Sequence, residues 1–393
     1  MTVRGHFVKF FTSLRLTVVL LVLSIVLVFW ATLAQTHLGI WGVQERFFRT
    51  FFVLVHIPGT NIPIPAFPGG YFLGTLLLIN LIASHVYRFH FTWRKAGIQM
   101  THFGLIVLLL GELITGILQQ DFQLRLQEGE TKNHSESFRL NELAIIDMTD
   151  AQFDDVVAIP EETVAKGAPI QHPKLPFRVI PHGYLPNANL QMQAQTPPGA
   201  PTVTNLSTQG IGPRLSVIPM RPTYRDNERN LPSAFVELIG AEGPIGTWLV
   251  SPMLVQPQIF EYAGRTWRLE FRFLREYKPF SLELLELRHD IYPGSDIPKN
   301  FSSRVRIQAA DGSDQREALI YMNNPLRYRG FTFYQYQMDS ANGFSVLQVV
   351  RNPGWIIPYI ACVLLTLGLL WQFLYHLWTF ARRRRPAPRP VLA

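Results

Sequence analysis

The sequence predicts a membrane protein with four transmembrane α-helices and one large extracytoplasmic, mostly antiparallel β domain between helices three and four. The four apolar stretches are 16–33, 71–87, 98–118 and 355–377. Each is close to the roughly 20 residues that a helix needs to cross the hydrocarbon core of a bilayer. After residue 119 the apolar residues alternate with a period of two, which is typical of strands. The uneven charges around the helices give the orientation.

Arg4, Lys9 and Arg15 precede the first helix, Arg88, Arg94 and Lys95 lie between the second and third, and four arginines at 382–385 follow the fourth. The connection 35–70 holds only Arg46 and Arg49. Cytoplasmic segments carry the excess of Lys and Arg. Both termini and the connection between the second and third helices are therefore expected in the cytoplasm. The β domain is expected on the periplasmic or outer side of a cytoplasmic (inner) membrane.

The chain is expected to have three parts. Residues 1–118 form a membrane part with three helices and a Pro-rich outer loop at 35–70. Residues 119–352 form the extracytoplasmic β-rich domain, and 353–393 hold the fourth helix and a basic tail. The first helix has a longer apolar core than a signal peptide and lacks a small-x-small cleavage site, so we expect a retained anchor.

Period-two patterns predict several strands in the β domain: 122–126, 138–140, 213–218, 234–238, 266–273, 281–287, 303–307, 331–336 and 344–350. Turn residues such as Glu128-Gly129 and Asp311-Gly312 separate these runs. No helix of 12 or more residues is expected there, and 194–209 is expected to be a long loop.

Composition excludes several function classes. The net charge of +8 could attract nucleic acid, but much of the excess lies in the cytoplasmic flanks, so no nucleic acid is expected. The single cysteine, Cys362, lies in the fourth helix. The β domain therefore has no disulfide, no thiolate metal site and no thiol-disulfide chemistry of its own. The chain has no Cys-x-x-Cys-His and is not itself a c-type cytochrome.

Three histidines, His85, His102 and His376, fall inside the predicted helices at similar depth near their cytoplasmic ends. Ionisable residues in a bilayer are candidates for function, and neutral imidazole is a good axial ligand of haem iron. Hydrogen bonding between helices is the alternative for His85 and His102. For His376 we expect an interfacial histidine near a helix C-terminus.

The cations Arg88, Arg94 and Lys95 are candidates for contacts with haem propionates, although membrane orientation alone would also explain them. Glu112 is either a proton or cofactor site or a group that reaches the outer interface. We expect Asn80 to fix helix packing.

Small residues let transmembrane helices approach each other closely. Gly104, Gly111 and Gly116 are expected to do so on the third helix.

Several motifs carry a family resemblance: 13–21 (SLRLTVVLL), 80–89 (NLIASHVYRF), 102–105 (HFGL), 126–131 (LQEGET), 278–280 (KPF), 321–326 (YMNNPL), 329–335 (RGFTFYQ) and 350–355 (VRNPGW). In this order, with four helices and one large domain before the last, the chain resembles the ResB/CcsB family of cytochrome c biogenesis proteins of maturation system II. The resemblance covers nearly the whole length.

The resemblance implies a subunit that works with a CcsA/ResC-type membrane partner. Together they would carry haem b outward and attach it to the Cys-x-x-Cys-His thiols of apocytochrome c, with thioredoxin-like reducing factors as further partners. It implies that His85 is an axial ligand of haem iron, together with a partner histidine, and that His102 is a second ligand or a support. The partner's tryptophan-rich motif is missing, so the chain is expected to be a subunit of a holocytochrome c synthase (haem-lyase) complex that is not catalytic alone.

Two other readings remain open. A b-type redox protein would hold one haem between His85 and His102 and would show a bis-histidine spectrum alone. A non-catalytic envelope scaffold would bind another protein through its β domain and would contain no haem in any preparation.

Overall fold

The computed structural model describes residues 3–57, 62–87, 92–150, 152–225, 228–294, 298–339 and 342–383. The chain forms two compact units. The first, the membrane unit, comprises Met1–Gln120, Tyr224–Asp226 and Asn352–Ala393. The second, the sheet domain, comprises Asp121–Thr223 and Asn227–Arg351.

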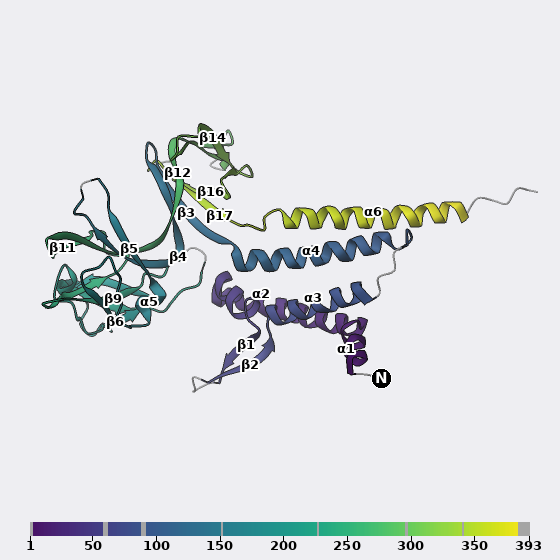
Figure 1. Cartoon of the computed structure of the whole chain (residues 1–393), viewed down its shortest axis with the longest axis horizontal. Helices are drawn as coiled ribbons and strands as arrows, with labels where there is room; N and C mark the ends of the chain where they lie inside the picture. Colours follow the sequence, from purple (N-terminus) through teal and green to yellow (C-terminus); the bar gives the residue numbers. More distant parts are fainter. Residues whose placement is uncertain are drawn as a thin grey trace, which may run out of the picture. The chain divides into compact units, whose positions relative to one another are not determined.

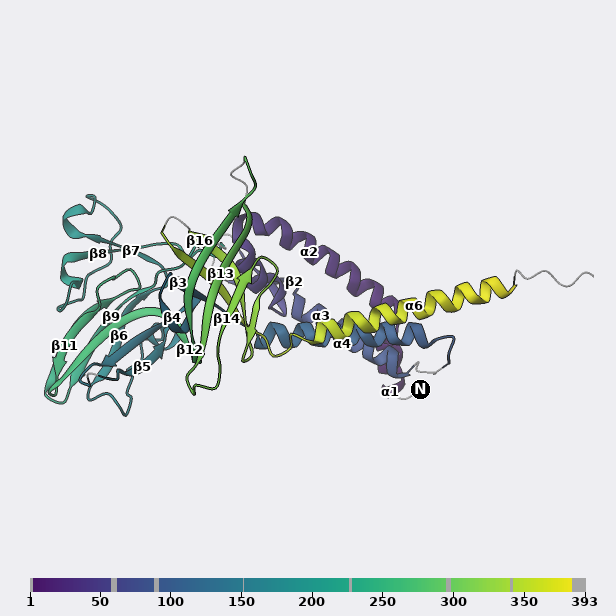
Figure 2. The same ribbon diagram turned by 90° about the horizontal axis from the view of Figure 1, so that it is seen from above.

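The α-helices of the membrane unit are α1 (Val3–Phe11), α2 (Leu14–Val43), α3 (Gly70–Tyr87), α4 (Ala96–Leu118) and α6 (Ile357–Arg383). All except α1 are long and apolar enough to cross a membrane. The four expected apolar helices are thus present. In both views α4 runs beside α6 (Figures 1 and 2).

The region 35–70 is more ordered than the expected loop. Helix α2 continues to Val43 and is followed by a π-helical turn, η1 (Gln44–Phe48). An antiparallel hairpin follows, made by β1 (Phe52–His56) and β2 (Pro63–Pro68). The first proline after residue 35 is Pro58, so nothing before it blocks helical hydrogen bonding. Gly39 has φ 72°, a backbone conformation that glycine adopts without steric strain. The helix kinks at this residue and then continues to Val43.

Glycines explain how closely α4 packs against α6. A Cβ added at Gly97 or Gly111 would come within 2.6 Å of an α6 atom, and one added at Gly104 within 3.0 Å. Their spacing of seven places all three on one helix face. The prediction was right for Gly104 and Gly111, missed Gly97, and was wrong for Gly116, whose added Cβ would meet nothing within 4 Å.

The sheet domain confirms the expected antiparallel β architecture. Among its described residues the single α-helix is the short α5 (Glu161–Ala165), with two 3-10 turns, η2 (Gln193–Gln195) and η3 (Gly212–Arg214). Its strands are β3 (Gln120–Gln127), β4 (Thr131–Asp147), β5 (Asp155–Pro160), β6 (Arg178–Leu185), β7 (Ala188–Met192), β8 (Leu215–Pro219), β9 (Ser233–Gly240), β10 (Gly243–Val250), β11 (Gln258–Tyr262), β12 (Arg265–Ile291), β13 (Pro298–Ala309), β14 (Gln315–Tyr321), β15 (Leu326–Tyr328), β16 (Phe331–Asp339) and β17 (Phe344–Arg351).

These strands make one large sheet and two small ones. The large sheet has the order β14-β13-β12-β4-β3-β17-β16-β15, with β11 attached to β12 and β5 attached to β4. The small sheets are β10-β9-β6 and β7-β8. The long strands β12 and β4 can be followed through the large sheet in Figure 2.

Strand β12 joins two hydrophobic cores. The expected strands 266–273 and 281–287 are one continuous strand in the structure. Its first half contributes Trp267 and Phe271 to one core, and its second half contributes Phe280 and Leu284 to another. Strand β4 pairs along both halves across two register shifts, which keeps β12 continuous between the cores.

Candidate functional site

A cavity of about 380 Å³ lies in the membrane unit where α1 meets α2, α3 ends and α4 begins. It is lined by Thr12, Leu14, Thr17, Asn80, Leu81, Ser84, His85, Lys95, Ile98, Gln99 and His102. Its volume is within the range of small-ligand pockets, roughly 300 to 1,000 Å³.

The break between α1 and α2 forms one wall of this cavity. Ser13 is extended, with φ −78° and ψ 126°, so the two helices are separate. The carbonyls at the end of α1 lack partners within their helix. Asn80 Nδ2 donates to Phe11 O at 2.7 Å, and Thr17 Oγ1 donates to Asn80 Oδ1 at 2.7 Å. Asn80 is 2% exposed, so the expectation that it fixes helix packing is confirmed.

The two candidate histidines reach the same cavity from consecutive helices. His85 is half-buried in the last turn of α3, with its ring centroid 6.4 Å from that of Phe103. His102 is on α4 and is exposed. Lys95 and Gln99 precede His102 by seven and three residues, which places them on the same side of α4. The cavity is therefore open on the side where His102 is exposed.

The other candidate residues lie elsewhere. Arg88 is outside the described residues, and Arg94 is exposed and does not line the cavity. His376 is hydrogen-bonded to Gln372 of its own helix at 2.6 Å between nitrogens and also does not line the cavity. Glu112 is exposed on α4, which leaves both of its interpretations open.

Of the three cations considered for propionates, the structure thus brings Lys95 to the cavity. Gln99 and Thr12 were not predicted as lining residues. The spacing of Lys95, Gln99 and His102 along one helix face was a signal for Gln99. No sequence pattern indicated Thr12, because its place in the cavity wall depends on the break between α1 and α2.

The chemistry of the lining fits haem. Two imidazoles can bind haem iron, the Lys95 ammonium can pair with a propionate, and Leu14, Leu81 and Ile98 offer apolar surface. The exposure of His102 leaves part of such a ligand uncovered by this chain.

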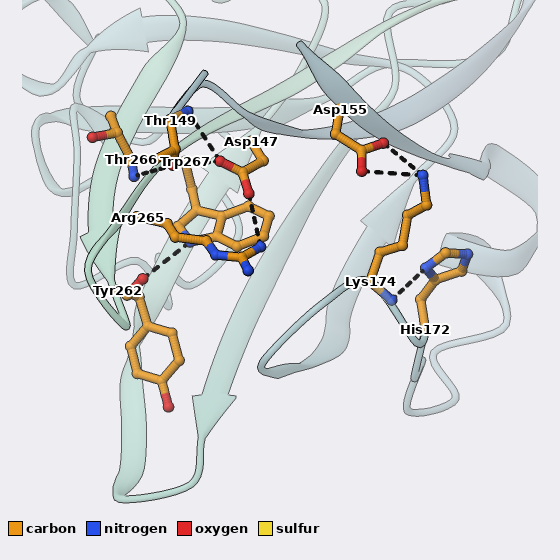
Figure 3. Close-up of polar contacts among 9 residues, drawn as sticks. All are labelled: Asp147, Thr149, Asp155, His172, Lys174, Tyr262, Arg265, Thr266 and Trp267. Carbon is orange, nitrogen blue, oxygen red and sulfur yellow. Dashed lines mark hydrogen bonds and ion pairs between the residues drawn. The ribbon is translucent and has the colours of Figure 1, made fainter. Parts of the chain in front are cut away.

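A second hollow, of about 390 Å³, lies in the sheet domain and is less suited to chemistry. Each cation on its wall already has a carboxylate partner: Lys174 Nζ lies 2.7 Å from Asp155 Oδ1, and Arg265 Nη1 lies 3.0 Å from Asp147 Oδ2 (Figure 3). Trp267 Nε1 donates to Tyr262 O at 3.2 Å. These contacts hold strand ends together. Across the described residues, no three His, Cys, Asp or Glu side chains are grouped so that they could hold a metal ion.

Comparison with known proteins supports the family resemblance. The ResB-like family matches residues 264–342, which include β12 to β16. Protein NrfI of Wolinella succinogenes is 36% identical over 96 residues. That alignment spans 24% of this chain and 11% of the relative, so the chain corresponds to about a tenth of its length. Both matches agree with the resemblance to the ResB-like family that the sequence motifs carry, and the family match covers residues 264–342.

Proposed function

We propose that this chain is a ResB/CcsB-like subunit of a membrane complex for cytochrome c maturation, which receives haem b and passes it outward for attachment to apocytochrome c. One observation carries the proposal: His85, His102 and Lys95 line one cavity, in a chain that matches the ResB-like family over residues 264–342. The partners would be a CcsA/ResC-type membrane protein, apocytochrome c and thioredoxin-like reducing factors.

The three ionisable residues of the lining each have a role in this proposal. His85 binds the iron of the transported haem, and Lys95 pairs with a propionate and so orients the ring. His102 supports the haem or its ligand, and the open side of the cavity faces the partner, which supplies the second axial histidine. The orientation expected from the positive-inside rule places this cavity near the cytoplasmic surface, where haem is made.

The attachment reaction itself belongs to the complex. Each cysteine thiol adds across a haem vinyl group, so that a carbon–sulfur bond forms and the thiol hydrogen goes to the other vinyl carbon. This addition consumes no external oxidant or reductant. The thiols must be reduced beforehand, which is the task of the reducing factors. The sheet domain would dock the apocytochrome or these factors.

The test compares His85→Ala with His376→Ala, a histidine near the end of another helix that does not line the cavity. In the complex with its partner, His85→Ala should lower haem content and c-type cytochrome yield at least tenfold, because the iron loses an axial ligand. Added imidazole should restore both in part, and His376→Ala should behave as wild type. Normal haem content and yield in His85→Ala would refute the proposal.

A single-chain redox protein is the second candidate, because both histidines line one cavity. It predicts low-spin, six-coordinate haem in the chain without its partner, lost equally in His85→Ala and His102→Ala. The split site predicts little haem until the partner is present and a milder defect in His102→Ala. We favour the split site because His102 is exposed and the cavity is open.

A further inference from the structure

The edge of β12 that faces away from β4 contains a gap in its pairing. β4 pairs with β12 from Trp267 to Tyr277 on one edge. On the opposite edge, the pairing of β12 with β11 stops at Leu269, and its pairing with β13 starts at Phe280. Among the described residues, no strand pairs with that edge over 270–278. A free strand edge presents unpaired N–H and C=O groups to a further strand.

A cavity of about 290 Å³ lies along this gap. Its outer wall is the segment 251–257, which links β10 to β11 and has no regular secondary structure. Pro252 and Pro257 in this wall have no N–H to donate to β12. Val255 lines the cavity and is 94% exposed, so it marks the rim.

Arg272 contributes a buried donor without an acceptor. Its side chain is 10% exposed, its Nε donates to Glu142 Oε1 at 2.9 Å, and its Nη1 donates to Glu270 Oε2 at 3.3 Å. Nη2 is buried and has no hydrogen-bond partner among the described residues. A buried unsatisfied donor is costly, so an acceptor supplied from outside would be favourable here.

The charges of the lining decide what kind of acceptor fits. Two carboxylates, Glu136 and Glu270, balance two guanidinium groups, Arg272 and Arg275. The lining thus has no net charge, and an anion would gain little from it. A neutral carbonyl oxygen satisfies the Nη2 donor without adding charge.

The size of the cavity and the apolar residues of its lining further restrict the class of ligand that it can bind. Leu254, Val255, Phe271 and Phe273 offer contacts to an apolar side chain. The volume is near the lower limit of small-ligand pockets, so it accepts a short stretch of extended chain and no folded element.

We propose that this gap binds an extended, uncharged polypeptide segment of another protein, which adds to the free edge of β12 as a short strand. Main-chain hydrogen bonds give such additions their affinity, and side-chain pockets give them specificity. Arg272 Nη2 donates to a carbonyl of the bound segment, and the wall 251–257 covers its outer side. This binding is separate from the haem cavity and does not depend on it.

The probe is a fluorescent, amidated hexapeptide of alternating Thr and Val, mixed with the full chain in detergent. Two N-methylated versions carry methyl groups on the odd or on the even amides. Because a strand pairs through alternate amides, one version should bind at least tenfold more weakly while the other binds like the parent. Bound parent peptide should slow hydrogen exchange of the β12 amides over 270–278.

Two chain variants link binding to this gap. Arg272→Lys keeps the charge but loses the planar donor group and should weaken binding at least tenfold. Val255→Lys, at the rim, should weaken it several-fold, whereas Phe153→Lys, at a 75% exposed apolar residue that does not line the cavity, should not. Val255→Lys keeps the test valid if Arg272→Lys fails to fold. Equal binding of both methylated peptides, tighter binding of an Asp-substituted peptide, or no effect of Val255→Lys would overturn the proposal.

Discussion

The membrane unit and the sheet domain place polar side chains in opposite ways. In the membrane unit, His85, His102 and Lys95 line a cavity with an open side. In the sheet domain, Glu142 and Arg272 form a buried ion pair between β4 and β12, with side chains 5% and 10% exposed. A buried pair fixes the strands that carry it, while an open cavity leaves its groups available to a ligand. Loss of Glu142 should therefore reduce the stability of the sheet domain, whereas substitutions of His85, His102 or Lys95 should reduce ligand binding in the membrane unit.

The largest expected effect on folding is at the buried pair. Removing one partner of a buried pair costs roughly 3 to 5 kcal/mol, because the other charge stays buried without compensation. The loss of stability in Glu142→Gln should be near the lower limit of this range, because Glu270 Oε2 still contacts Arg272 Nη1 at 3.3 Å. The measurement is hydrogen exchange of the β4 and β12 amides in the full chain.

The matched variant in the membrane unit is His102→Ala, which removes an exposed side chain from an open cavity. It should leave the stability of the partner-free chain within about 0.5 kcal/mol of wild type. A loss at His102→Ala as large as that at Glu142→Gln would mean that the cavity is part of the structural core, and the contrast between the two regions would fail.

A smaller effect is expected at Lys278, which is 7% exposed between the two cores of the sheet domain. Its Nζ donates to Ser135 Oγ and to Glu276 O, and it lies 4.9 Å from the centre of the Phe331 ring. Burial lowers the pKa of Lys278 to about 8, and the nearby Glu276 offsets this only in part.

The sign of the pH dependence follows from that pKa. Between about pH 8 and 10.5 the unfolded chain keeps the lysine proton that the folded chain has lost, so stability should rise with pH in this window. The rise is at most roughly 3 kcal/mol, at about 1.4 kcal/mol for each pH unit. Lys278→Met should abolish it in unfolding curves recorded from pH 7 to 10.5. An equal rise in the variant would assign the effect to other groups.

The sequence predicted the parts of the fold that have strong local patterns. Long apolar runs gave the four helices, and clear alternation gave strands such as β9 and β17. Seven strands of the sheet domain were missed: β5, β6, β7, β10, β11, β14 and β15. In β6 and β10, proline and glycine interrupt the alternation, and β15 has only three residues, too few to show it. The union of two predicted strands into β12 was also missed, since it depends on β4, which pairs along both halves.

The residues of the candidate site also divide into those that the sequence could predict and those that it could not. His85 and His102 could be found from the sequence, because histidines are unusual in apolar helices. Lys95 could not be separated from Arg94, because both lie in the turn before α4, where no helical period predicts which side chain faces the cavity. The gap beside β12 could not be predicted at all. The gap exists because β12 pairs with β11 only up to Leu269 and with β13 only from Phe280. Pairing between distant segments leaves no local pattern in the sequence.

The smallest effect expected within the sheet domain is at its hollow of about 390 Å³. Lys174 and Asp155 form an ion pair with side chains 58% and 59% exposed (Figure 3). Exposed pairs contribute roughly 0 to 1 kcal/mol, because water and salt screen them. Lys174→Ala should therefore change the stability of the sheet domain by less than about 1 kcal/mol, and 1 M salt should remove the difference. The same unfolding curves, measured at low and high salt, test this. A loss above 2 kcal/mol that persists in salt would mean that this surface pair acts like the buried Glu142–Arg272 pair, and that burial is not what separates the two.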